Sequence, residues 1–276
     1  MDGGSHDNII GTDQITVTYN TLGNVLIQGS TTATNTLKSL KALTSAGFGL
    51  ALRNGTFNNT LGEVGTAGTN NFSSNQGQGL EISGGAHDND VVNAWIVENG
   101  HNGIRLTGAG TTGNTIWGVV LWANTYDGLS EGNGATGNIW TVSSAWGNGG
   151  LSVDKYADSE TTNDLNPAAV KIQSSVLVSD IITVTGTATP SNLFTSVKVD
   201  AYEISPDANG HLGLGYVGGS SVSITGTWVI TKSDRFLDKT CVAVIQTTTT
   251  TLLGITRNST EPSYTNCRLL MPAIRR

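Results

Sequence analysis

The segment Gly103-Ile104-Arg105-Leu106, followed by Asn114-Thr115-Ile116, decides the fold because its order of residues recurs along the first half of the chain. The repeated unit is a glycine, an alternation of apolar and polar residues, and then an asparagine with an apolar residue two positions after it. Further copies begin at Gly49, Gly79 and Gly128. A fixed repeat of short strands without helical periodicity predicts a β-solenoid.

An asparagine occupies the same place in each copy of the repeat. These register asparagines are Asn8, Asn35, Asn59, Asn89, Asn114 and Asn138, and their spacings are 27, 24, 30, 25 and 24 residues. One coil therefore takes about 24 residues, and the longest spacing contains an extra loop. Asparagine tolerates the left-handed backbone of a tight corner, and stacked amides can hydrogen-bond between turns. We predict that the six asparagines form a structural ladder.

Apolar residues fall into columns when the copies are placed in register. Two positions after the asparagines lie Ile10, Leu37, Leu61, Val91, Ile116 and Trp140. A second set of apolar residues follows the glycines and alternates with polar residues, as in Leu80-Glu81-Ile82. This alternation has the period of a strand with one buried face. Connections between parallel strands wind in a right-handed sense. We therefore expect 1–153 to form a right-handed parallel β-helix of about six coils.

The register is lost after Val153. The polar segment 154–174 has the composition of a linker or cap. Beyond it, apolar runs between Val176 and Ile245, with Ser221–Ile224 among them, follow one another at the spacing of a β-sandwich. The region 175–276 is therefore predicted to be an immunoglobulin-like β-sandwich, which makes the whole chain all-β.

Two runs carry a resemblance to a known family, Asn59-Thr60-Leu61-Gly62 and Gly100-His101-Asn102-Gly103-Ile104-Arg105-Leu106. They resemble motifs of bacterial right-handed β-helix repeat proteins, a superfamily that is similar in fold to pectate lyases. The region 175–276 resembles the small sandwich modules that follow such β-helices, in which Thr240-Cys241-Val242 matches a late strand. This resemblance implies a disulfide between Cys241 and Cys267. The motifs specify architecture and leave the chemistry open.

Composition argues against two classes of partner. Lysine and arginine number 14 against 21 aspartates and glutamates, a formal charge of -7, so the chain has nothing to attract nucleic acid. No stretch approaches the roughly 18 apolar residues of a membrane span. The start Met1–Ser5 lacks the regions of a signal peptide, so either a leader has been removed or the chain is a fragment. Two cysteines are too few for a zinc pattern, and a disulfide would imply an oxidising compartment.

Acidic residues are the candidates for catalysis, because hydrolysis of a polysaccharide needs carboxyl groups that converge on one outer face. Asp127 and Glu131 are weak candidates, since their spacing is not diagnostic. Glu131 occupies a column that is otherwise apolar, where a carboxylate is costly to desolvate. A local bulge that turns Glu131 outward is the expected arrangement, and a tuned acid is the alternative.

Two His-Asp pairs raise the question of a metal site. His87-Asp88 repeats His6-Asp7, but three coils separate the two copies. We therefore expect hydrogen bonds at corners rather than a shared metal site. No metal and no cofactor is predicted.

Trp122 and Trp146 each lie eight positions after a register asparagine, so the two indoles should stack on adjacent coils. If they are exposed, they form a carbohydrate-binding platform or an interaction face. The alternative, favoured by the usual burial of tryptophan, is that this column points inward or is covered by a loop or by the second domain.

These features support three hypotheses on function. The first is an extracellular or cell-surface structural or adhesive protein, which assembles as a homo-oligomer or head-to-tail filament because its first coil lacks a cap. The second is a carbohydrate-active β-helix, either a polysaccharide lyase, a glycoside hydrolase or a phage-type spike, that grips a glycan with Asp127, Glu131 and the two tryptophans. The third is a glycan-binding protein without turnover.

Overall fold

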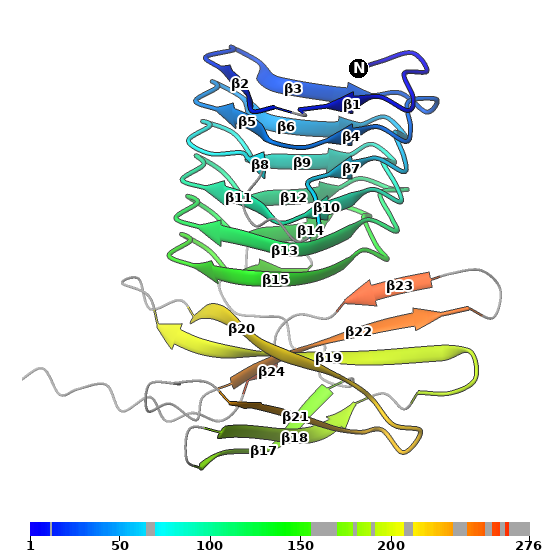
Figure 1. Ribbon diagram of the computed structural model, residues 1–276, viewed down its shortest axis with the longest axis vertical. Coiled ribbons are helices and arrows are strands. Elements are labelled where there is room, and N and C mark those ends of the chain that lie inside the picture. Colours follow the sequence, from blue (N-terminus) through cyan, green and yellow to red (C-terminus); the bar gives the residue numbers. More distant parts are fainter. Residues whose placement is uncertain are drawn as a thin grey trace, which may run out of the picture.

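The structure is a computed structural model, and it describes residues 1–11, 13–64, 70–155, 170–178, 181–188, 191–206, 212–233, 242–251, 256–259 and 263–264. Every regular element in these ranges is a β-strand. Coils of parallel strands stack into a solenoid, and antiparallel strands lie across the end of its last coil (Figure 1). Within the described ranges, no helix is long and apolar enough to cross a membrane.

Each coil of the solenoid has three faces. The first face contains β1 (Ile9–Ile10), β4 (Thr36–Leu37), β7 (Thr60–Leu61), β10 (Asp90–Val92), β13 (Thr115–Trp122) and β15 (Ile139–Trp146). The second contains β2 (Ile15–Thr18), β5 (Leu40–Leu43), β8 (Asn70–Asn71), β11 (Ala94–Val97) and the later halves of β13 and β15. The third contains β3 (Gly23–Gln28), β6 (Phe48–Arg53), β9 (Leu80–Ser83), β12 (Ile104–Thr107), β14 (Leu129–Gly132) and β16 (Val153–Asp154).

The strand register confirms the predicted parallel solenoid of about six coils. The predicted apolar column lies in one contiguous row through Ile10, Leu37, Leu61, Val91, Ile116 and Trp140. On the third face, Leu80 pairs with Ile104 and Ile104 with Leu129, all fully buried. The alternation read from the sequence therefore places one side chain in two inside the solenoid.

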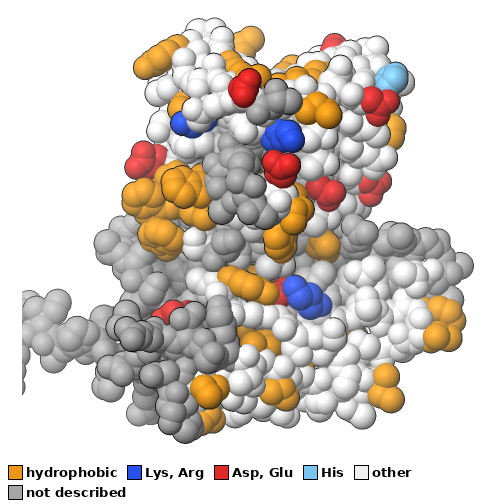
Figure 2. Space-filling model, viewed as in Figure 1, with side chains coloured by type: hydrophobic (Ala, Val, Ile, Leu, Met, Phe, Trp, Pro, Cys, Tyr) orange, Lys and Arg blue, Asp and Glu red, His pale blue; other side chains and the backbone are white. Residues whose placement is uncertain are grey.

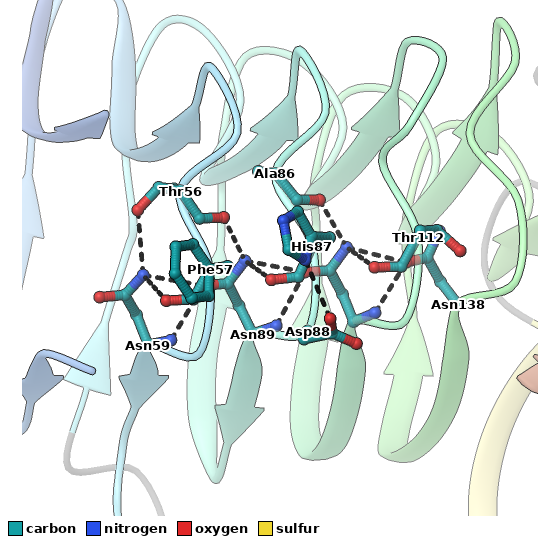
Figure 3. Close-up of polar contacts among 10 residues, drawn as sticks. Thr56, Phe57, Asn59, Ala86, His87, Asp88, Asn89, Thr112 and Asn138 are labelled. Carbon is teal, nitrogen blue, oxygen red and sulfur yellow. Dashed lines mark hydrogen bonds and ion pairs between the residues drawn. The ribbon is translucent and has the colours of Figure 1, made fainter. Parts of the chain in front are cut away.

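The register asparagines lie in a row along one corner, and Figure 3 shows the part of this row between Asn59 and Asn138. Each side-chain amide donates to the side-chain oxygen of the next asparagine, at 2.8 to 3.0 Å, from Asn8 through Asn35, Asn59, Asn89 and Asn114 to Asn138. The same oxygens also accept backbone N–H groups from the preceding coil, as Asn114 does from Asn89. The five asparagines after Asn8 are buried, so these bonds satisfy polar groups that water cannot reach.

A second ladder runs along another corner and was not predicted. It contains Asn75, Asn99, Asn124 and Asn148, and the side-chain amide of each of the first three donates to the side-chain oxygen of the next at 2.9 to 3.0 Å. The sequence signal is present, because Asn99, Asn124 and Asn148 each follow a register asparagine by ten residues. The insertion before Asn75 breaks that spacing in its own coil, and Ser45 occupies the equivalent position one coil earlier, so the column is hidden.

The C-terminal region forms two antiparallel layers. The first consists of β17 (Val170–Val178), β18 (Ile181–Ala188) and β21 (Thr227–Ser233). The second consists of β19 (Thr195–Pro206), β20 (Leu212–Ser221), β22 (Val242–Thr250), β23 (Thr256–Ser259) and β24 (Ser263–Tyr264). Apolar side chains from both layers, such as Val184 and Val199, share one buried core.

The second layer caps the solenoid. β20 pairs antiparallel with β15 through Ser144 and Ala145, so the open edge of the last coil has a partner. Tyr202 and Ile245 enter the core of the solenoid itself. The cap therefore covers the end of the apolar interior as well as the strand edge.

Three sequence predictions need correction or fall outside the described ranges. β17 begins at Val170, inside the predicted linker. The predicted strand Ser221–Ile224 is wrong, because Ser221 is the last residue of β20, whose many glycines concealed it as a strand. Cys241 and Cys267 lie outside the described residues.

Replacement of a buried ladder residue, Asn114→Ala, should destabilise the protein by roughly 3 kcal/mol, because it leaves several buried donors and acceptors unpaired. The matched control is Asn8→Ala at the exposed end of the same ladder, with an expected loss of about 1 kcal/mol or less. Urea denaturation of both variants measures the difference. Equal losses would show that the ladder contributes nothing beyond a surface hydrogen bond.

Candidate functional site

An open groove runs along the outer side of the second face, over coils two to six. It has a volume of about 610 Å³. Its lining comes from five strands and their corners: Leu43, Asn71, Ser73, Ser74, Trp95, Val97, Glu98, Val120, Trp122, Ser144 and Trp146. Hydrophobic side chains gather on this flank of the solenoid, near the ends of β11, β13 and β15 (Figure 2). The groove is therefore an aromatic surface held by a rigid sheet.

Trp122 and Trp146 lie on adjacent coils, as the repeat predicts, and face outward. The two residues are paired in register, and their ring centroids are 5.9 Å apart at an interplanar angle of 35°. Their neighbours Leu121 and Ala145 point inward and are fully buried, whereas the tryptophans are 39% and 42% exposed. The alternative that this column packs in the core is therefore wrong.

Gly147 leaves room for the indole of Trp122. A Cβ atom at this position would lie 3.2 Å from both Cδ1 and Nε1 of Trp122. Gly147 also has a φ of +65°, which a larger residue adopts at a cost. The turn after β15 therefore keeps the side of the Trp122 ring uncovered.

Trp95 is a third member of the groove, and sequence reasoning missed it. It lies on β11, is paired with Val120 of β13, and is 50% exposed. Its column holds Val120 and Ser144 in the following coils, so no aromatic repeat marks it. The sequence does contain a signal, because side chains two residues apart on a strand point to the same face. Trp95 lies two residues before Val97, which pairs with Trp122, so Trp95 points outward as Trp122 does.

Glu98 stands at the corner that borders the groove, and it is the only ionisable side chain in the described lining. Its backbone has a φ of 56°, and its N–H donates to the carbonyl oxygen of Trp122 at 2.9 Å. The carboxyl group is exposed. Polar groups on Asn71 and Ser144 complete the lining, so the groove combines flat apolar rings with hydrogen-bonding groups.

Asp127 does not belong to the groove. Its Oδ1 accepts the backbone N–H of Leu151 at 2.9 Å, and its own N–H donates to Oδ1 of Asn102 at 3.0 Å. These bonds connect three successive coils at one corner. The carboxylate therefore has a structural position between coils.

Glu131 points into the solenoid, and the predicted outward bulge is wrong. It pairs in register with Leu106 and is only 1% exposed. Nδ2 of Asn138 donates to its Oε1 at 2.6 Å, and Nζ of Lys155 lies 3.3 Å from its Oε2. Glu131 therefore ends the first ladder, because it accepts the amide of the last asparagine. These two partners offset the cost of desolvation that made an inward carboxylate improbable from the sequence.

Burial raises the pKa of Glu131, and Lys155 and Asn138 oppose that rise. Lys155 is itself buried, donates to the carbonyl oxygen of Ser259 in the cap, and lies 5.3 Å from the ring centroid of Trp140. Neither Glu131 nor Asp127 lines the groove. The structure therefore does not bring the two candidate acids together with the tryptophans.

The His-Asp pairs form corner hydrogen bonds, as expected. Nδ1 of His87 lies 2.9 Å from Oδ2 of Asp88, and the imidazole stacks on Phe57 with centroids 5.2 Å apart (Figure 3). His6 and Asp7 make the same bond at 2.8 Å. Among the residues with described positions, no three His, Cys, Asp or Glu side chains gather in a way that could hold a metal ion.

The fold and the groove together define a capped parallel β-solenoid with an aromatic outer face. The chain matches no protein-family model and no curated protein. Among solved structures, it is similar to the enzymatically active domain of tailspike protein 2 from bacteriophage CBA120, with 11% identity and a TM-score of 0.36. That alignment covers 92% of this chain and 54% of the tailspike chain, so this chain spans about half of that structure.

The variant Glu131→Gln should weaken the pH dependence of stability. Because the pKa of Glu131 in the folded state is raised above its ordinary value of 4.5, its contribution is full below that value and is lost as the pH rises through the folded pKa. The Tm of the wild type minus that of Glu131→Gln should therefore fall from about pH 4 to about pH 7. Thermal denaturation across this range measures it.

The control for this experiment is Glu63→Gln, at a carboxyl that is 51% exposed and 3.5 Å from Lys38. This change should leave the pH profile of Tm close to that of the wild type. A constant difference in Tm between wild type and Glu131→Gln at every pH would contradict the raised pKa.

Proposed function

We propose that this chain is an extracellular or cell-surface β-solenoid that binds glycans through the groove around Trp122 and Trp146. One observation carries the proposal, namely three tryptophans that lie partly exposed on one open face. Tryptophan combines a large apolar face with an N–H donor, which suits the apolar face and the hydroxyl groups of a sugar ring. Exposed aromatic clusters of this kind mark binding surfaces.

The rigidity of the solenoid supports the proposal. Trp122 and Trp146 lie on strands that pair in register from Val120 to Trp122, and the second ladder holds the adjacent corner through Asn124 and Asn148. A binding face that is ordered before the ligand arrives avoids the cost of ordering it on binding. Asn71 and Ser144 supply hydrogen-bonding groups beside the rings.

Turnover by Asp127 and Glu131 is not part of the proposal. Asp127 bridges backbone groups of neighbouring coils, and Glu131 is buried against Lys155. The proposed binding role therefore involves neither Asp127 nor Glu131, and a lyase or hydrolase would need other acids.

The sequence predictions on organisation stay proposals. We retain a solenoid over 1–153, a linker or cap that begins at 154, and an immunoglobulin-like module that ends at 276, and we propose that this module begins at Val170, the first residue of β17, rather than at 175.

Homo-oligomers or head-to-tail filaments would display the groove many times over, which raises avidity. Electron microscopy of the purified protein distinguishes filaments from single particles.

The double variant Trp122→Ala, Trp146→Ala should lose glycan binding roughly tenfold or more, if each ring contributes about 1 kcal/mol. Its Tm should stay near that of the wild type, because both rings face outward. A glycan array identifies a ligand, and calorimetry then measures its affinity.

The matched control is Trp117→Ala, which removes an indole that is 43% exposed but does not line the groove. Its affinity should equal that of the wild type. A collapse of stability in the double variant, or an equal loss of affinity in Trp117→Ala, would refute the groove as the binding site.

A further inference from the structure

We infer that the groove selects uncharged glycans and that Glu98 is the residue that excludes acidic ones. This inference rests on the proposed function, because it assigns the ligand class of the same groove. Its starting point is the charge of the described lining, whose eleven residues include one carboxylate and no lysine, arginine or histidine. An acidic polysaccharide would find no counter-charge there.

From Glu98 toward the last coil, the corner beside the groove carries progressively smaller residues. Backbone hydrogen bonds place Ser74, Glu98, Ala123 and Gly147 in one column, each with a positive φ. The side chains in this column shorten from Glu98 to Ala123 and vanish at Gly147. A ligand that lies on Trp122 and Trp146 therefore has free space beside it and meets Glu98 at one end.

The backbone of Glu98 is held at the corner next to Trp122. Its N–H donates to the carbonyl of Trp122, so its Cα belongs to the same rigid corner. Repulsion between two like unit charges about 4 Å apart lowers affinity by roughly fivefold in bulk water and by more near a protein surface. A uronate or sulfate at this end of the groove would be disfavoured in this way, whereas a hydroxyl or acetamido N–H can donate to the carboxylate.

The nearest cation on the same face does not cancel this effect. Lys41 lies on β5, where it pairs with Asn71, and Asn71 pairs with Trp95. Lys41 is therefore two coils away from Trp95 and does not line the groove. The net charge of -7 on the whole chain also disfavours the approach of a polyanion.

The experiment compares uncharged and acidic probes on one array. The uncharged probes are chitohexaose, maltohexaose, mannohexaose and xylohexaose, and the acidic probes are hexagalacturonate, hexaguluronate and a heparin hexasaccharide. Wild type should bind an uncharged probe and no acidic one. Glu98→Lys should gain at least roughly tenfold for acidic probes, because reversal of one charge turns repulsion into attraction.

Glu98→Gln is the matched control, since it keeps the length and hydrogen-bonding capacity of the side chain without its charge. Its affinity for acidic probes should lie between those of wild type and Glu98→Lys, and the double tryptophan variant should bind neither class. All three carry substitutions at exposed positions, and circular dichroism verifies their folding.

The outcomes separate the two levels of the argument. If wild type binds acidic probes and loses them in the double tryptophan variant, glycan binding stands and the selectivity is refuted. If Glu98→Lys leaves the ratio of acidic to uncharged binding unchanged, Glu98 does not determine selectivity. If wild type binds no probe at all, the proposed function falls together with this inference.

Discussion

The structure depends on the hydrogen bonds that pass from one coil to the next through buried asparagine amides. Backbone pairing alone fixes the distance between coils, but the corners between faces leave polar groups that water cannot reach. Each ladder asparagine fills this need twice, because its amide donates to the next side chain while its oxygen accepts from the previous coil. Two such ladders hold two corners of the solenoid in register.

The last asparagine of the first ladder needs a different partner, and this need explains why Glu131 and Lys155 are buried. Asn138 has no further asparagine below it, and the carboxylate of Glu131 accepts its amide instead. Ser259 of the cap pairs with backbone groups that would otherwise bond to a further coil. Its N–H donates to the carbonyl of Asn138, and its hydroxyl accepts the N–H of Trp140. The buried charges Glu131 and Lys155 thus belong to the end of the solenoid.

The same register produces the groove. Because successive coils superpose residue on residue, an outward position on one strand has neighbours directly above and below it. Val97, Trp122 and Trp146 form one such column, and Trp95 stands two residues away on the same face. Small residues at the adjoining corner, Ala123 and Gly147, leave the rings uncovered. The stacking of coils therefore also aligns outward side chains into a surface that can bind a ligand.

The sequence by itself determined the solenoid, its register asparagines and the pairing of Trp122 with Trp146, because a fixed repeat leaves these contacts no other arrangement. It could not determine the second ladder, whose spacing an insertion interrupts, or the place of Trp95, which has no aromatic equivalent in its column. Only the tertiary structure decided that Glu131 faces inward and that the tryptophans stay open to solvent. The physical reason is that burial depends on what covers a position, and Lys155 and Ser259 reach this site from outside the repeat.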